Sequence, residues 1–260
     1  MELPTPSLSL ENRHAIVTGA GNGLGLAIAR RMALGGARVF LVDRDPAVLE
    51  RIGSSDLPAQ TASALVKDLA DEDAARVVFA EALEACGTID TLVNNAAWSF
   101  HKPMLGVTSA EFDRLIAINQ RAPFFLAQQF LRHVAGPNFK SSEPAIVNVA
   151  SVNALVGNPE LVPYAGTKGA LLAMTRAMAV EMAPFGVRVN AISPGAVDTF
   201  VTRSLVANGT IEPSKLFAKH LVKRFASCEE VAELVSYLCS PAAACVNGAN
   251  WVIDGGYTAQ

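Results

Sequence analysis

The chain has 260 residues, of which 51% are hydrophobic and 17% charged, and its net charge at pH 7 is -3. This composition excludes a disordered polymer and supplies enough apolar material for a large core. The mild acidity gives no electrostatic reason to expect nucleic acid as a partner. Mean hydropathy is positive at +0.30, yet nowhere do 18 apolar residues follow one another, so we expect no membrane span.

The N-terminal stretch MELPTPSLSLENRH has neither the charged nor the apolar segment of a signal peptide. The four cysteines, Cys86, Cys228, Cys239 and Cys245, form no C-x-x-C pair and show no zinc-type spacing. We therefore expect a cytoplasmic protein with free thiols and without a metal site.

Short β-branched runs alternate with longer helical patterns along nearly the whole chain. The runs lie at 14–18, 37–42, 63–67, 90–94, 145–150, 187–192 and 250–253. They are almost continuously apolar, as in strands that are buried on both faces of a parallel sheet. The helical segments lie near 23–34, 71–86, 109–134, 161–183 and 228–239. Two of them begin with a capping box, Thr108-x-x-Glu111 and Ser227-x-x-Glu230.

This alternation predicts an α/β fold with a doubly wound, Rossmann-like parallel sheet and helices on both of its faces. We expect about seven strands in a single domain over residues 1–260. The segment at about 197–226 interrupts the alternation and carries no clear strand. Because ligands of such sheets bind beyond the carboxyl ends of the strands, we interpret it as a substrate lid. The alternative is a helical excursion on the surface without a part in catalysis.

A glycine-rich turn lies between the first strand and the first helix, with glycines at 19, 21, 23 and 25. Glycines allow a tight turn and let backbone amides approach a pyrophosphate, which the positive end of the helix dipole also attracts. The spacing is T-G-x-x-x-G-x-G and not G-x-G-x-x-G. The interpretation as a dinucleotide site therefore depends on the strand before the turn and the helix after it.

Asp43 ends the second predicted strand, 18 residues after Gly25. A carboxylate at this position accepts hydrogen bonds from the adenosine ribose and repels a 2′-phosphate, which favours NAD over NADP. Arg44 follows directly and could bind that phosphate, so NADP stays open as the less favoured cofactor. Asp43 could also merely cap a strand-to-helix turn.

Tyr164 and Lys168 stand four residues apart in a segment of mostly Ala, Leu, Met and Val. The spacing puts both on one helix face, where they either form an acid–base pair or are a packed ring and a surface lysine. The rest of this helix is apolar around most of its circumference, so we expect it to be covered on two sides. The second cover is either another subunit or the chain's own domain.

These features resemble the short-chain dehydrogenase/reductase family over roughly residues 10 to 258. The matching stretches are TGAGNGLG (18–25), NNAA (94–97), Asn119 in AINQRAPF, Ser151 in VASVNA, YAGTK (164–168), SPG (193–195) with Thr199, and VIDGGY (252–257). Ser151 stands thirteen residues before Tyr164, as in the family. Ala97 replaces the usual glycine of the family, for which we expect a small local adjustment.

The resemblance implies an NAD(P)-dependent oxidoreductase that acts on CH–OH groups, with Tyr164 as its general acid/base. A free tyrosine has a pKa of about 10, and the Lys168 ammonium and an oxidised nicotinamide would stabilise its phenolate. Ser151 is implied to hydrogen-bond the substrate oxygen, and Lys168 to hold the nicotinamide ribose. Asn119 is implied to hold a water that links Lys168 to solvent.

The resemblance also implies cofactor contacts by position, for each of which a purely structural role is the alternative. They are Gly19, Asn22, Gly23, Leu24, Gly25, Asp43, Arg44, Asp68, Leu69, Asn95, Ala96, Tyr164, Lys168, Pro194, Gly195, Val197 and Thr199. Members of the family commonly form tetramers through the Tyr164 helix, so we expect a homo-oligomer, a tetramer or a dimer.

For the substrate we expect contacts from Trp98, His101, Ser151, Asn153 and Tyr164, with Asn158 and Glu160 nearby. This mixture suits a small sugar, polyol or hydroxy acid, whose carboxylate could meet lid cations among Arg203, Lys215, Lys219 and Lys223. Two other functions stay open. One is an NADPH-dependent reductase of 3-oxoacyl thioesters or other ketones. The other is a non-catalytic dinucleotide-binding regulatory protein, which has no need for Ser151, Tyr164 and Lys168 together.

Overall fold

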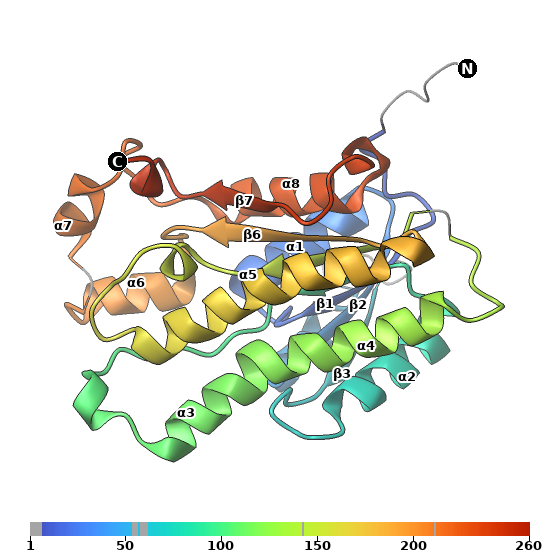
Figure 1. Cartoon of the computed structure of the whole chain (residues 1–260), viewed down its shortest axis with the longest axis horizontal. Helices are drawn as coiled ribbons and strands as arrows, with labels where there is room; N and C mark the ends of the chain where they lie inside the picture. Colours follow the sequence, from blue (N-terminus) through green and yellow to red (C-terminus); the bar gives the residue numbers. More distant parts are fainter. Residues whose placement is uncertain (1–6, 54–56, 58–61, 142, 211) are drawn as a thin grey trace.

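The computed structural model of the chain describes residues 7–53, 57, 62–141, 143–210 and 212–260. Its strands form one parallel sheet in the order β3-β2-β1-β4-β5-β6-β7 (Figure 1). The chain runs from the interior strand β1 outward to β3, and then crosses over to build the rest of the sheet from β4 to β7. This is the doubly wound, Rossmann-like sheet that the sequence predicts.

The strands are β1 (His14–Thr18), β2 (Arg38–Asp43), β3 (Ala62–Val66), β4 (Thr91–Asn94), β5 (Ala145–Val149), β6 (Arg188–Pro194) and β7 (Asn250–Ile253). Predicted and observed bounds agree for β1 and β7, and differ by one or two residues elsewhere. Burial on both faces holds for β4, β5 and β6. It fails for β7, where Trp251 and Val252 are exposed, because β7 is an edge strand.

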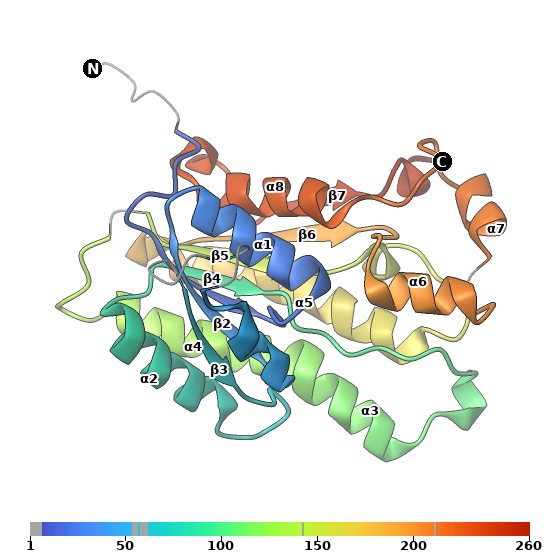
Figure 2. The same cartoon turned by 180° about the vertical axis from the view of Figure 1, so that it is seen from behind.

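Helices cover both faces of the sheet (Figures 1 and 2). On one face lie α1 (Gly23–Leu34) and α8 (Cys228–Cys239), and on the other α2 (Ala74–Cys86), α4 (Ala122–Val134) and α5 (Val162–Met182). Short 3₁₀ turns occur at Pro46–Arg51, Met104–Gly106, Val152–Ala154, Ala183–Phe185, Pro241–Ala243 and Tyr257–Ala259. No helix among these described residues is long and apolar enough to cross a membrane.

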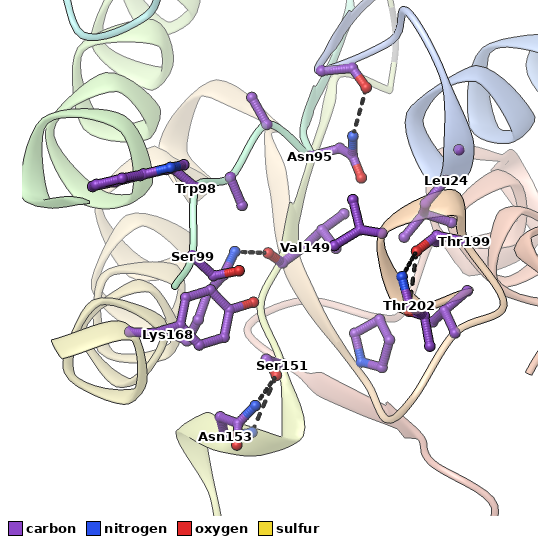
Figure 3. Close-up of a pocket in the computed structure, with 18 of the residues that line it drawn as sticks. Leu24, Asn95, Trp98, Ser99, Val149, Ser151, Asn153, Lys168, Thr199 and Thr202 are labelled. Atoms are coloured by element: carbon purple, nitrogen blue, oxygen red, sulfur yellow. Dashed lines mark hydrogen bonds between the residues drawn. The ribbon is translucent and has the colours of Figure 1, made fainter. Parts of the chain in front are cut away.

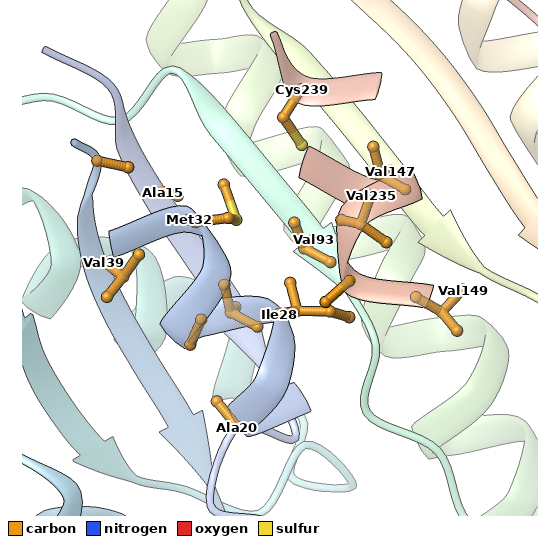
Figure 4. Close-up of a cluster of buried hydrophobic side chains, with 14 of the residues drawn as sticks. Ala15, Ala20, Ile28, Met32, Val39, Val93, Val147, Val149, Val235 and Cys239 are labelled. Carbon is orange, nitrogen blue, oxygen red and sulfur yellow. The ribbon is translucent and has the colours of Figure 1, made fainter. Parts of the chain in front are cut away.

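Each face of the sheet has its own core, because successive strand residues point to opposite sides. Ala15 and Val17 of β1 belong to the core under α1 and α8, whereas Ile16 between them belongs to the core under α2, α4 and α5. Ile28 and Val235 meet in the first core, which joins α1 to α8 over the sheet (Figure 4). The two cores hold the sheet rigid and so fix where its carboxyl edge lies.

The segment predicted as one helix over 109–134 is divided into three parts. It consists of α3 (Ser109–Ile116), a π-helical turn at Ala117–Arg121, and α4. Such turns insert an extra residue into a helix and recur at functional sites. Both predicted capping boxes, at Thr108 and Ser227, are present.

Helix α5 is covered by the chain on one side only. Its buried side includes Thr167, Lys168, Leu171 and Thr175, at the spacing of one helix face. On the opposite side Val180 is 77% exposed. The alternative that α5 is covered wholly within its own domain is therefore wrong.

The segment 197–226 forms two short helices, α6 (Phe200–Ala207) and α7 (Pro213–Ala218), at the carboxyl edge of the sheet (Figure 1). Residue 211 within it lies outside the described residues. Val197 and Ala226 form an isolated parallel bridge, which closes the segment at its base. We call residues 197–226 the lid, after the predicted role as a cover of the substrate, which stays a prediction.

Candidate active site

A cavity of about 760 Å³ lies at the carboxyl edge of the sheet. It runs from the glycine turn and the ends of β2 and β3, past the end of β5, to the lid. With the exception of Asn119, the residues predicted for catalysis, for the cofactor and for substrate contacts line this cavity, whereas the lid cations Arg203, Lys219 and Lys223 do not. Ala97, which was expected beside the cofactor, and Ser99, which was expected near the substrate, also line it. The structure adds lining residues that were not singled out: Phe200, Val201, Thr202, Leu205, Leu216, His220 and Tyr257.

The glycine turn is packed too closely for side chains. A Cβ added to Gly25 would lie 1.9 Å from the carbonyl oxygen of Gly19, and one added to Gly19 would lie 2.8 Å from Ala96 Cα. Gly19 also has a φ of +64°, which disfavours a side chain. Asn95 holds the turn in place, since its Nδ2 donates to the Gly19 carbonyl oxygen at 3.1 Å. The close packing leaves the backbone of the turn facing the cavity.

Helix α1 begins at this turn without a capping side chain. Its N-cap residue Asn22 makes no capping hydrogen bond, and its first turn carries no acidic residue. The free amides and the positive dipole end therefore remain available to an anion, so the turn fits a pyrophosphate. Leu24 in this first turn borders the cavity (Figure 3).

Asp43 ends β2 and reaches across to the glycine turn. Its Oδ2 accepts from the Gly21 amide at 2.9 Å, and its Oδ1 accepts from the Asp45 amide at 3.0 Å. The alternative that Asp43 caps the turn after β2 thus accounts for its contact with the Asp45 amide. Each oxygen keeps a lone pair for a further donor, so the carboxylate still fits a ribose diol. Arg44 beside it is exposed and also lines the cavity.

Asp68 lies at the same end of the cavity. Partial burial opposes its ionisation, but hydrogen bonds from the Ala70 amide and from Arg114 hold its pKa below the ordinary value. Arg114 donates to Asp68 Oδ2 at 2.8 Å, while its guanidinium lies 5.8 Å from the centroid of the Trp98 ring. One arginine thus connects the end of β3 with Trp98, which lines the far part of the cavity.

Lys168 is a buried residue, only 2% exposed, so the surface-lysine alternative is wrong. Its Nζ donates to the carbonyl oxygen of Val149 at 2.7 Å (Figure 3) and lies 5.7 Å from the centroid of the Tyr164 ring. Burial lowers the pKa of Lys168 to about 8. The ammonium therefore loses its proton much more easily than an ordinary lysine does.

Tyr164 meets Lys168 on the cavity side of α5. Burial raises the pKa of Tyr164 to about 12, and a hydrogen bond with Ser151 opposes this rise only in part. We expected Lys168 to stabilise the phenolate, but in the protein alone desolvation outweighs any such effect. The ionised form of Tyr164 needs additional positive charge.

The Ser151 hydroxyl terminates a chain of hydrogen bonds. Its Oγ accepts from the Asn153 amide at 3.1 Å and from Asn153 Nδ2 at 3.2 Å. Asn153 Oδ1 in turn accepts from Asn158 Nδ2 at 2.7 Å, and Asn158 Oδ1 accepts from the Tyr257 hydroxyl at 3.1 Å. Because both lone pairs of the serine oxygen are taken, its own hydrogen must be donated onward.

Asn119 is the predicted site residue that the structure removes from the cavity. Its side chain is fully buried, because the π-helical turn directs it inward. Its amide accepts from the Trp98 amide at 2.8 Å and donates to the Trp98 carbonyl at 2.9 Å and to Thr167 Oγ1 at 3.2 Å. The side chain thus joins the segment of Trp98 to α5. Both hydrogens of Nδ2 are used, while Oδ1 keeps a lone pair, so the water on Asn119 stays a prediction.

Three of the lid cations predicted to receive a carboxylate, Arg203, Lys219 and Lys223, do not line the cavity. Arg203 pairs with Asp198 at 2.7 and 2.9 Å, and Lys223 donates to the Phe217 carbonyl oxygen at 2.8 Å. Lys219 lies 5.9 Å from the centroid of the Tyr257 ring. The side chain of Lys215 lies outside the described part of the chain.

His220 and Tyr257 are the main residues that sequence reasoning missed. Their rings stack at 5.2 Å with an interplanar angle of 14°, and both line the cavity. His220 follows α7 in the lid, while Tyr257 comes after β7. Tyr257 closes the VIDGGY stretch, which was a usable signal, but no local pattern distinguishes His220.

Known proteins with related sequences match the chain over nearly its full length. The family model described as Enoyl-(Acyl carrier protein) reductase matches residues 19–258. Galactitol 2-dehydrogenase (L-tagatose-forming) of Cereibacter sphaeroides is 36% identical over 255 residues, which cover 96% of each protein.

Solved structures also match the fold over nearly the full length of the chain. A 3-ketoacyl-(acyl-carrier-protein) reductase from Brucella melitensis, complexed with NADH, has a TM-score of 0.87 at 34% identity and covers 96% of this chain and 100% of its own. A gluconate 5-dehydrogenase from Burkholderia cenocepacia, in complex with NADP and tartrate, has a TM-score of 0.88 at 29% identity and covers 97% and 98%. Both cofactors thus occur among the neighbours.

Proposed function

The chain belongs to the short-chain dehydrogenase/reductase family, and we propose that it transfers a hydride between NAD and a small polar secondary alcohol or ketone, with Tyr164 as general acid/base. Its class is that of NAD(P)-dependent oxidoreductases acting on CH–OH groups. The observation that carries the proposal is the meeting of Ser151, Tyr164 and buried Lys168 in the cavity that also holds the glycine turn.

The cofactor assignment rests on the turn and on Asp43. A bound nicotinamide dinucleotide would accept or supply the hydride. The start of α1 would hold its pyrophosphate, Asp43 its adenosine ribose, and Lys168 its nicotinamide ribose. The negative charge of Asp43 opposes a 2′-phosphate, which favours NAD, whereas the exposed Arg44 keeps NADP as the alternative.

Tyr164 exchanges the proton. During oxidation its phenolate oxygen takes the proton of the substrate hydroxyl, and during reduction its phenol returns a proton to the carbonyl oxygen. A pKa of about 12 in the protein alone means that the phenolate is scarce at neutral pH. A protonated Lys168 and the positive ring of an oxidised nicotinamide would each stabilise it when the site is filled.

Ser151 orients the substrate oxygen. Since Asn153 occupies the acceptor sites of its hydroxyl, Ser151 has a single hydrogen to donate, which goes to Tyr164 in the protein alone and would go to the substrate oxygen when substrate is bound. This polarity suits the partial negative charge that develops on that oxygen during the reaction.

Two other functions have weaker support. An NADPH-dependent reductase of 3-oxoacyl thioesters would use the apolar lid residues Phe200, Val201 and Leu205, which line the cavity. Asp43 argues against its cofactor. A non-catalytic dinucleotide-binding protein would leave Ser151, Tyr164 and Lys168 without a purpose, and in particular would not need a buried lysine.

We also infer a homo-oligomer in which a second subunit covers the exposed side of α5. Besides Val180, this helix carries Gly166 and Gly169, where an added Cβ would meet no atom within 4 Å. Light scattering on the purified protein tests this inference, because a single monomeric mass would exclude it.

The proposed reaction is tested by nicotinamide absorbance over a panel of sugars, polyols, hydroxy acids and simple ketones, with NAD and NADP in parallel. Tyr164→Phe protein is the matched blank, because it keeps the ring and loses the proton-transfer group. We expect turnover with NAD that falls by about 10²–10⁴ in the variant. Equal rates in both proteins would exclude the mechanism.

A further inference from the structure

His220 brings an unpartnered nitrogen to the cavity. The side chain is only 3% exposed, and its Nδ1 lies 2.8 Å from the carbonyl oxygen of Leu216. Because a carbonyl oxygen only accepts, Nδ1 must carry a hydrogen, and Nε2 of the neutral ring is then an acceptor. Within the described part of the chain, Nε2 has no hydrogen-bond partner. Nε2 is not one of the fully enclosed, unpartnered nitrogens of the described residues, so it is open to the cavity and available to a donor group of a ligand.

The surrounding contacts fix this ring. Tyr257 stacks on it, and the hydroxyl of Tyr257 is anchored on Asn158, which itself lines the cavity. Position 255 on the other side favours glycine, because its φ is +63° and an added Cβ would lie 3.3 Å from His220 Cδ2, a tight contact. Three distant segments of the chain therefore build one polar wall beyond Ser151.

The charge at this end of the cavity is negative. Of the described residues that line the cavity between Ser151 and the lid, Glu160 carries a charge. None of the described lining residues is an arginine or a lysine of the lid. Glu160 has a φ of 65°, unusual for a residue with a side chain, and its carboxylate makes no hydrogen bond within the described residues. Such a rim disfavours a carboxylate and offers an acceptor to hydroxyl groups.

We propose that this wall is a subsite for an uncharged polyol or ketose, in which a hydroxyl group away from the reacting carbon donates to His220 Nε2. A second hydroxyl group interacts with Asn158 or Glu160. The inference rests on the proposed function, because it assigns the substrate of the same site. It narrows the predicted substrates by excluding hydroxy acids.

Two variants separate substrate binding from packing. His220→Asn keeps an amide that donates to the Leu216 carbonyl but has no polar atom at the Nε2 position, whereas His220→Gln restores one there. The probes are sorbitol and hexan-2-ol, which have the same chain length. We expect the KM of sorbitol to rise about 3- to 10-fold in His220→Asn and to recover partly in His220→Gln.

The KM of hexan-2-ol should stay the same in all three proteins. An equal rise for both alcohols would show that His220 only packs the lid, and no rise for either would show that no hydroxyl group binds there. Either result overturns the proposal.

The charge argument is tested with sorbitol and gluconate, using calorimetric dissociation constants on protein saturated with reduced cofactor. Sorbitol should bind more tightly, and Glu160→Gln should narrow the difference. Tighter binding of gluconate to the wild-type protein would overturn the proposal. Because this measurement needs no turnover, His220-dependent binding of sorbitol without oxidation of any alcohol would refute the proposed reaction and keep the subsite.

Discussion

The ammonium of Lys168 lies 5.7 Å from the centroid of the Tyr164 ring, yet it donates its hydrogen bond to the carbonyl oxygen of Val149 and not to the phenol. Val149 ends β5, two residues before Ser151. One buried lysine thus joins the helix that carries the tyrosine to the strand that carries the serine. Its charge reaches the phenol through space, across a short distance.

The raised pKa of Tyr164 predicts that its phenol makes no contribution to tyrosinate absorbance in the free enzyme up to about pH 10. Since its pKa is about 12, against an ordinary value of 10.0, Tyr164 stays protonated through pH 10. In a titration of tyrosinate absorbance, wild-type protein and Tyr164→Phe should therefore agree up to pH 10. Adding oxidised cofactor should create a difference below that pH, and a difference already present without cofactor would contradict the raised pKa.

The buried lysine predicts a stability cost that depends on pH. The pKa of Lys168 in the folded state, about 8, lies below its ordinary value of 10.5. Between these values the unfolded chain binds more protons, so wild-type stability rises with pH across this window, and the cost is fully present below pH 8. Lys168→Met should be inactive and yet raise Tm at pH 7 by about 3–6 °C.

The advantage of Lys168→Met should shrink as the pH rises from 8 to 10.5. The exposed Lys140 provides the control, because Lys140→Met should change Tm little at any pH. Thermal unfolding of all three proteins across this range makes the comparison. A Lys168→Met protein that is less stable than wild type at pH 7 would show that the bond to Val149 outweighs the desolvation of the charge.

Asp43 has two separable effects, charge and turn geometry. Asp43→Asn keeps an acceptor for the Gly21 amide but removes the charge, so the ratio of NADP to NAD efficiency should rise by at least about tenfold at unchanged Tm. Asp43→Ser loses both effects and should also weaken NAD. Steady-state kinetics with each cofactor measures these ratios, and unchanged ratios in both variants would refute the role of Asp43.

The glycine turn predicts a sharp contrast between two glycines. Gly25→Ala would place a Cβ 1.9 Å from the Gly19 carbonyl oxygen, so the turn must shift and cofactor binding should be lost. Gly166→Ala meets nothing within 4 Å and should leave cofactor affinity intact. Fluorescence titration with NADH compares the two. Wild-type affinity in Gly25→Ala would mean that the backbone of the turn is not the binding element.

The hydrogen-bond chain predicts an effect of Tyr257 on catalysis. Tyr257→Phe keeps the stack on His220 but removes the donor to Asn158, which loosens the orientation of Ser151. We expect kcat/KM to fall about 3- to 10-fold. Tyr237→Phe is the control, since Tyr237 packs on Trp251 outside the cavity. Equal effects of both variants, or none, would show that Ser151 needs no support from this chain.

The features that the sequence predicted well depend on local chain geometry. Alternation of apolar runs gave the sheet, and the capping boxes at Thr108 and Ser227 marked two helix starts within one turn of chain. The four-residue spacing of Tyr164 and Lys168 put both on one face because a helix repeats every 3.6 residues. Capping and helical spacing are the same in any fold that contains these local elements.

Other features depend on which distant segments meet. The π-helical turn that directs Asn119 away from the cavity forms inside a pattern that reads as a continuous helix. The stack of His220 on Tyr257 and the pairing of Arg203 with Asp198 follow from how the lid lies on the sheet edge.

The raised pKa of Tyr164 likewise reflects desolvation, which is a property of all surrounding atoms and not of any neighbouring residue in the chain. The sequence by itself determined the strands, the helices and the chemical groups of the site. Only the tertiary structure decided which of those groups face the cavity and how strongly burial changes them, because packing joins residues that the chain separates.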